Sequence, residues 1–129
     1  MVELDGGWQQ HLYLAEGRCD GVISGRFRGA NAPLRQGAEG PFRPDIRAGV
    51  EADDGSTIMF ECRGYGRAYP PGRRQVVGAV FHSSDAERFR RLNDAVCVCV
   101  GEVRAAADPA QAPDLVLDVA ELIWGPIDD

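Results

Sequence analysis

The stretch Asp45-Ile-Arg-Ala-Gly-Val-Glu-Ala-Asp-Asp-Gly-Ser-Thr-Ile-Met-Phe-Glu-Cys-Arg63 decides the fold class. Two segments of alternating apolar and polar residues, 45–52 and 57–63, flank Asp54-Gly55, a dipeptide that favours the tight turn of a β-hairpin. Successive side chains of a strand point to opposite faces. The first strand would therefore have an apolar face and a charged face: Ile46, Ala48 and Val50 against Asp45, Arg47 and Glu51.

Further strands and one helix are expected on both sides of this hairpin. Ser84-Asp-Ala-Glu87 is a capping-box sequence, and Phe89 and Leu92 follow on one helical face, which predicts a short helix over 85–93. Residues 29–44 have no period and are rich in Gly and Pro, so we expect a loop over one mouth of a barrel. The other expected strands are 11–15, 19–28, 75–82, 96–103 and 115–124, after a loosely ordered segment 1–8.

This series of short strands favours an antiparallel β-barrel or a β-sandwich with one short helix. We expect a barrel, because glycines within the strands suit its corners and because closure removes the free edges of apolar segments such as 96–103. The 129 residues fit a single domain, 1–129.

Charge and composition exclude several classes of function. The net charge of −6 argues against nucleic acid and against an anionic membrane surface as partners. All 14 basic side chains are arginines, so chemistry that needs a lysine is excluded. We expect a cytoplasmic protein, because no apolar stretch is long enough to span a membrane and no signal-peptide pattern opens the sequence. We expect Cys97 and Cys99 to be reduced core thiols.

Several motifs, taken in their order and spacing over residues 9–124, resemble a bacterial family known as domain of unknown function 3237. They are Asp45-x-Arg47, Glu51-x-Asp53-Asp54-Gly55, Arg63-Gly64, Gly17-x-x-x-Gly21-x-x-x-Gly25, Phe89-x-x-Leu92-Asn93 and Val116-x-Asp118-Val-x-Glu121. The resemblance implies a small barrel similar in shape to lipocalin-like or allene-oxide-cyclase-like barrels, and it implies no established activity. Compared with the family, this chain is shorter at its N-terminus, which would leave an edge open for self-pairing.

The charged stripe of the hairpin is the main candidate site. If it faces the barrel interior, Asp45 or His82 would act as a base and Arg47 as the group that polarises a carbonyl or carboxylate. If it faces outward, it is a solvated surface with cross-strand ion pairs, and both orientations stay open. The remaining candidate ligand-binding residues are Glu51, Glu61, Arg63, Tyr65 and Trp124.

Three functions fit these residues. The first is a small-molecule-binding barrel, including a cofactor-free isomerase, cyclase or lyase that acts on a small carbonyl or carboxylate compound. The second is a non-catalytic ligand carrier or sensor. The third is a structural or assembly module, and a homodimer is compatible with each of them. We expect no cofactor and no metal site, because the sequence has no Cys-x-x-Cys, His-x-His or His-Glu-x-x-His motif.

Overall fold

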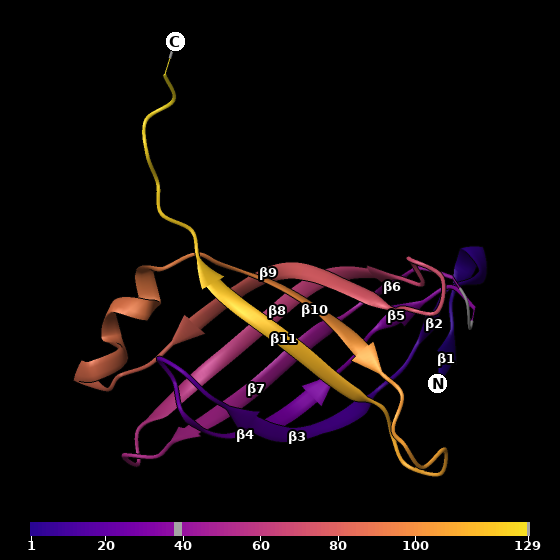
Figure 1. The fold of residues 1–129 in the computed structure, drawn as a ribbon, viewed down its shortest axis with the longest axis horizontal. Helices are drawn as coiled ribbons and strands as arrows, with labels where there is room; N and C mark the ends of the chain where they lie inside the picture. Colours follow the sequence, from indigo (N-terminus) through magenta and orange to yellow (C-terminus); the bar gives the residue numbers. More distant parts are fainter. Residues whose placement is uncertain (38–39, 129) are drawn as a thin grey trace.

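The computed structural model describes residues 1–37 and 40–128, and most of them lie in one antiparallel β-sheet (Figure 1). The main strands lie side by side in chain order, and each is antiparallel to its neighbours. They are β3 (Tyr13–Cys19), β4 (Gly25–Asn31), β7 (Asp45–Ala52), β8 (Thr57–Arg67), β9 (Gln75–Ser83), β10 (Cys97–Arg104) and β11 (Asp114–Glu121).

Short strands extend the sheet at one end. β2 (Gln9–Gln10), β5 (Leu34–Arg35) and β6 (Phe42–Arg43) stand next to β3, β4 and β7 in the chain. Pro33 separates β4 from β5 and Pro44 separates β6 from β7, because proline has no N–H to offer to a ladder. β1 (Val2–Glu3) pairs with β2, and a 3-10 turn, η1 (Asp5–Gly7), joins them.

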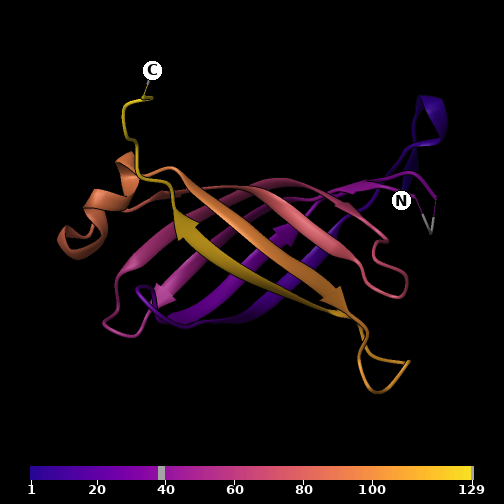
Figure 2. The ribbon, with the colours of Figure 1, turned by 45° about the horizontal axis from the view of Figure 1, so that its top comes forward.

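The sheet is strongly curved but not closed (Figure 2). Within the described residues, β3 pairs only with β4, and β11 pairs only with β10. The predicted all-β, antiparallel class with one short helix is thus confirmed, whereas the sheet is open and the expected barrel is not confirmed. No helix in the described part of the chain has the length and apolar character needed to cross a membrane.

The central hairpin forms as its sequence predicts. β7 begins and ends where expected, and β8 continues four residues further, from Arg63 to Arg67. Gly55 adopts a φ of 87°, and its N–H donates to the Ala52 carbonyl at 2.9 Å. The Asp54 carboxylate accepts from the Ser56 N–H at 2.9 Å, which fixes the turn.

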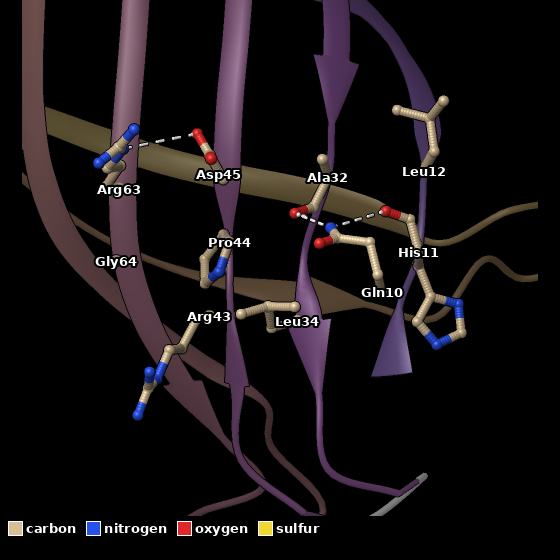
Figure 3. Close-up of a pocket in the computed structure, with 10 residues that line it drawn as sticks. All are labelled: Gln10, His11, Leu12, Ala32, Leu34, Arg43, Pro44, Asp45, Arg63 and Gly64. Carbon is tan, nitrogen blue, oxygen red and sulfur yellow. Dashed lines mark hydrogen bonds and ion pairs between the residues drawn. The ribbon is translucent and has the colours of Figure 1, made fainter. Parts of the chain in front are cut away.

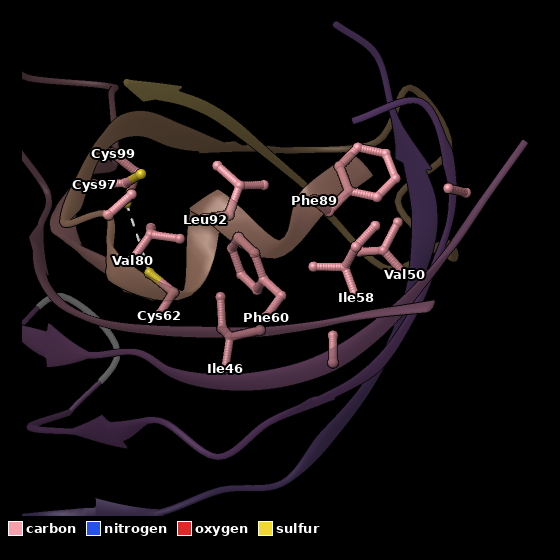
Figure 4. Close-up of a cluster of buried hydrophobic side chains, with 13 residues drawn as sticks. Ile46, Val50, Ile58, Phe60, Cys62, Val80, Phe89, Leu92, Cys97 and Cys99 are labelled. Atoms are coloured by element: carbon pink, nitrogen blue, oxygen red, sulfur yellow. Dashed lines mark hydrogen bonds between the residues drawn. The ribbon is translucent and has the colours of Figure 1, made fainter. Parts of the chain in front are cut away.

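The core lies on the concave side of the sheet (Figure 4). η2 (Glu87–Asp94), a 3-10 helix, covers one end of it with Phe89 and Leu92, as the sequence predicts. Glu87 closes no capping box here, because Ser84 Oγ instead accepts from the Ala86 N–H and donates to the Thr57 carbonyl. The other large buried side chains are Ile46, Val50, Ile58, Phe60, Val76 and Val80.

Three expected boundaries are wrong. The predicted strands 11–15 and 19–28 are instead β3 and β4, which meet at a turn where Gly21 has a φ of 124°. The predicted loop 29–44 contains the end of β4 and the strands β5 and β6; its residues 38–39 lie outside the described part. The last strand, expected over 115–124, ends at Glu121, and the chain then leaves the sheet.

Candidate functional site

The charged stripe of β7 and β8 lies on the outer, convex face of the sheet. Asp45 stands opposite Arg63 and Arg47 opposite Glu61 in the register of the two strands. One Asp45 carboxylate oxygen lies 3.8 Å from Arg63 Nε and 4.0 Å from Arg47 Nε. The side chains of Asp45, Arg47 and Arg63 are 39%, 62% and 74% exposed, so water screens these ion pairs and each contributes about 1 kcal/mol or less.

The remaining predicted ligand-binding residues, Glu51, Glu61, Tyr65 and Trp124, do not gather around one cavity. Glu51, Glu61 and Tyr65 alternate with buried residues and share the outer face with Arg47. Trp124 lies in the segment that projects away from the sheet after β11 (Figures 1 and 2). The arginine–carboxylate cluster is therefore a surface feature.

His82 points to the other side of the sheet, into the interior. It stands opposite the buried Phe60 in the register of β8 and β9, and the two rings meet edge to face with centroids 5.7 Å apart. Its buried Nδ1 has no hydrogen-bond partner within the described residues. Since His82 and Arg47 occupy opposite faces, the structure does not assemble them into one base–electrophile pair.

Burial also sets the protonation of His82. Because the charged imidazolium loses its hydration there, the pKa of His82 lies below its ordinary value of 6.5. The unfolded chain then binds a proton more readily than the folded protein. The stability that neutral His82 contributes is therefore complete above pH 6.5 and declines as the pH falls from 6.5 towards the folded-state pKa.

We expect a His82→Phe variant to lose less stability on acidification than the unaltered protein. Urea unfolding between about pH 5 and pH 8 measures the difference. His11→Phe is the control, because the His11 ring lies at the N-terminal end of the sheet and already bonds Gln9 and Tyr13. If the free energy of unfolding depends on pH in the same way in His82→Phe and in the unaltered protein, burial of this imidazole does not make folding stability depend on pH.

One hollow of about 670 Å³ lies beside the stripe, at the kink before β7 (Figure 3). The Asp45–Arg63 ion pair lies at one side of it, while Arg43 and His11 point away from that pair. The Arg43 guanidinium stacks on the Trp8 ring at 4.8 Å, so it is already engaged. The hollow is lined by Gln10, His11, Leu12, Ala32, Leu34, Arg43, Pro44, Asp45, Arg63 and Gly64.

Cys62 and Cys97 are poor nucleophiles at neutral pH, because burial raises the pKa of each thiol. Cys62, Cys97 and Cys99 are buried and free, and the sulfurs of Cys62 and Cys99 lie 3.6 Å apart. Desolvation, followed by the nearby Cys99, raises the pKa of Cys62 to about 12. Among the described residues, no three His, Cys, Asp or Glu side chains are grouped so that they could hold a metal ion.

An apolar patch that was not predicted from the sequence lies on the outer face of β8, β9 and β10. We call it the outer apolar patch, and its members are Tyr65, Val77, Ala79, Phe81, Val98 and Val100. The register places Tyr65 beside Val77, Val77 beside Val100 and Ala79 beside Val98. The signal was present, because residues 75–82 and 96–103 are apolar at successive positions, which is typical of strands covered on both faces.

Comparisons with protein-family models, with curated proteins and with solved structures found no match for this chain. The resemblance to domain of unknown function 3237 therefore stays a prediction. The candidate function rests on the geometry of the chain itself.

Proposed function

We propose that this protein is an assembly module in which two copies pack against each other through the outer apolar patch. The observation that carries the proposal is the contrast between the two halves of the convex face. The outer face of β3, β4 and β7 is mostly charged: besides the apolar Leu14 it bears Glu16, Arg18, Arg26, Arg28, Asp45, Arg47 and Glu51. The outer face of β9 and β10, together with Tyr65 of β8, exposes the outer apolar patch, with Phe81 at 49% and Val100 at 57%.

The rim of this patch suits a second copy of the same surface. Glu61 and Arg63 border it on β8, and Glu102 and Asp118 border it on the side of β10 and β11. A twofold axis brings each rim group of one copy opposite a different rim group of the other. A rim that contains both signs of charge can therefore be complementary to itself.

The available area supports a dimer of modest affinity. Strands about 4.8 Å apart with a rise of about 3.3 Å per residue give the outer face of β8 to β11 a footprint of roughly 19 Å by 30 Å. With side-chain relief, this approaches the ~800 Å² that each partner buries in a standard interface. Because the face is convex, two copies meet over less than that, so we expect the dimer to dissociate on dilution.

The test is the molar mass of a Phe81→Arg variant, measured by light scattering after size-exclusion chromatography over a concentration series. We expect the unaltered protein to be dimeric at high concentration and its dissociation constant to rise at least about 30-fold in the variant, which loses an aromatic side chain of the patch and places a charge there. Val22→Arg is the control, because Val22 is also an exposed apolar residue, at 67% against 49% for Phe81, but lies in the turn between β3 and β4.

A monomeric unaltered protein at all concentrations would overturn the proposal, as would equal effects of the two arginines. The predicted small-molecule-binding function, catalytic or not, stays a prediction. A small molecule could bind in the hollow beside Asp45 and Arg63. The charged stripe from which that function was predicted, however, faces solvent.

A further inference from the structure

The two free edges of the sheet leave room for one strand of a defined direction. Six successive antiparallel pairings lead from β3 to β11, so these two edge strands run in the same sense. A direct pairing between them would be parallel in an otherwise antiparallel sheet. A single added strand between β3 and β11, antiparallel to both, would close the sheet into a complete barrel.

The edge of the sheet formed by β2 and β3 already pairs with one short antiparallel strand, β1. β1 pairs antiparallel with β2 through Val2–Gln10 and Glu3–Gln9, on the edge of β2 that lies away from β5. Along the following strand, β3, the same edge has no partner within the described residues. The edge thus accepts an antiparallel strand and is left uncovered from Tyr13 to Cys19.

Apolar side chains on both sides of the opening face the interior and yet remain in water. Tyr13 on β3 and Leu115 and Val119 on β11 are in register with inward-facing residues of the neighbouring strands. Their exposed fractions are 46%, 39% and 43%. An added strand would cover them, since the inner face of a closed barrel is packed against the opposite wall.

The segment 122–128 has the character of such a strand. It follows β11, bends away from the direction of that strand and projects from the body (Figures 1 and 2). Leu122, Ile123, Trp124 and Ile127 are 57–95% exposed, which is unusual for four large apolar side chains in seven residues. Extended at about 3.3 Å per residue, it is as long as β3, which also has seven residues, and Pro126 leaves one position of the ladder without a donor.

Charge favours β3 as the place where this segment binds. Residues 114–129 contain five acidic residues and no basic one: Asp114, Asp118, Glu121, Asp128 and Asp129. On β3 and β4, three arginines, Arg18, Arg26 and Arg28, stand against one acid, Glu16. Asp128 lies in the segment itself, and its charge complements the arginines on the β3 side of the opening.

The direction of the chain decides which copy donates the strand. The segment leaves the end of β11 and leads away from the sheet, whereas the opening requires a strand that runs back alongside β11. Within one molecule the chain would have to reverse at once after Glu121, which would use Leu122, Ile123 and Trp124 in the turn. A second copy related by a twofold axis supplies the segment in the required direction without a turn.

We propose that segment 122–128 of a second copy adds between β3 and β11 as an antiparallel strand and completes the barrel. Two copies related by a twofold axis exchange these segments, so that each closes the other. This contact uses the free edges of the sheet and is independent of the outer apolar patch on its convex face.

The test uses the full chain with Phe81→Arg, which removes the outer apolar patch as an interface, and with Trp8→Phe, which leaves Trp124 as the only tryptophan. Val100→Arg replaces Phe81→Arg if the latter does not fold. Fluorescence emission of Trp124 and molar mass are recorded over a dilution series. We expect blue-shifted emission in a dimer at high concentration, and red-shifted emission in the monomer on dilution.

Trp124→Ala, added to Phe81→Arg, is expected to raise the dissociation constant of this dimer at least about 30-fold, and Trp124→Phe should restore much of the affinity. Red-shifted emission at every concentration would overturn the inference, because the segment is then not seated. Blue-shifted emission in a monomer would also overturn it, by placing the segment on its own chain. Either result leaves the outer-patch dimer of the unaltered protein intact, so the two proposals fail separately.

Discussion

Replacing Leu92 with alanine is expected to lower the free energy of unfolding by about 2–5 kcal/mol, the usual cost of removing a buried leucine side chain. Leu92 is 6% exposed and belongs to the same cluster as Phe60, Val80 and Phe89. η2 bears only Phe89 and Leu92 as buried anchors over eight residues, so the neighbouring groups cannot readily collapse into the space left by the truncation. Urea unfolding followed by circular dichroism measures the loss.

Leu4→Ala is the matched control, because the same atoms are removed from a side chain that is 46% exposed and lies outside the core cluster. We expect that variant to lose less than about 1 kcal/mol. If the two leucine variants lose equal stability, η2 does not anchor this end of the core. Burial of Phe89 and Leu92 would then contribute little to the stability of the fold.

The best-predicted parts of the fold are those in which local and tertiary signals agree. In β7, alternation, the Asp54-Gly55 turn and the apolar face of Ile46, Ala48 and Val50 all indicate the same register. In η2, the spacing of Phe89 and Leu92 identified the buried face, although the helix is of the 3-10 type. Where these signals agree, a sequence favours one strand register or one buried helix face over the alternatives.

The predicted strand boundaries were wrong where a glycine or a proline was interpreted as the end of a strand. Gly17 lies inside β3, where no atom would crowd a side chain, and Gly25 opens β4 against the backbone of Glu51. Pro33 and Pro44 interrupt the ladder without ending the strand direction, so β5 and β6 continue beyond them. Whether such a residue ends a strand depends on the neighbouring strand, which sequence spacing does not reveal.

The orientation of the candidate site could have been predicted from energy. Burial of an Ile or Val side chain contributes about 1.5–3 kcal/mol, whereas an exposed ion pair contributes about 1 kcal/mol or less. The face of Ile46 and Val50 therefore outcompetes the face of Asp45 and Arg47 for the interior. The outer apolar patch was harder to find, because an apolar strand covered by the same chain and one covered by another chain have the same sequence pattern.

The close approach of β4 to β7 gives the second large prediction. Gly29 faces the interior opposite Ala48, and a Cβ built on it would lie 2.5 Å from Ala48 Cα and 2.6 Å from Ala48 Cβ, and closer still to the Arg47 carbonyl oxygen. We expect Gly29→Ala to lower the free energy of unfolding by about 3 kcal/mol, the upper end of the usual cost of overpacking. The obstructing atoms belong to the backbone and to a Cβ, so relief requires the ladder between the two strands to open.

Gly49→Ala provides the control for this prediction, since Gly49 lies on β7 next to Ala48 but on the outer face, where an added Cβ meets nothing within 4 Å. That variant is expected to keep or gain up to about 1 kcal/mol, because alanine loses less backbone entropy on folding. Urea unfolding of both variants gives the comparison. Equal stability of Gly29→Ala and Gly49→Ala would mean that β4 and β7 can separate freely, and that the curvature of the sheet does not depend on their close contact.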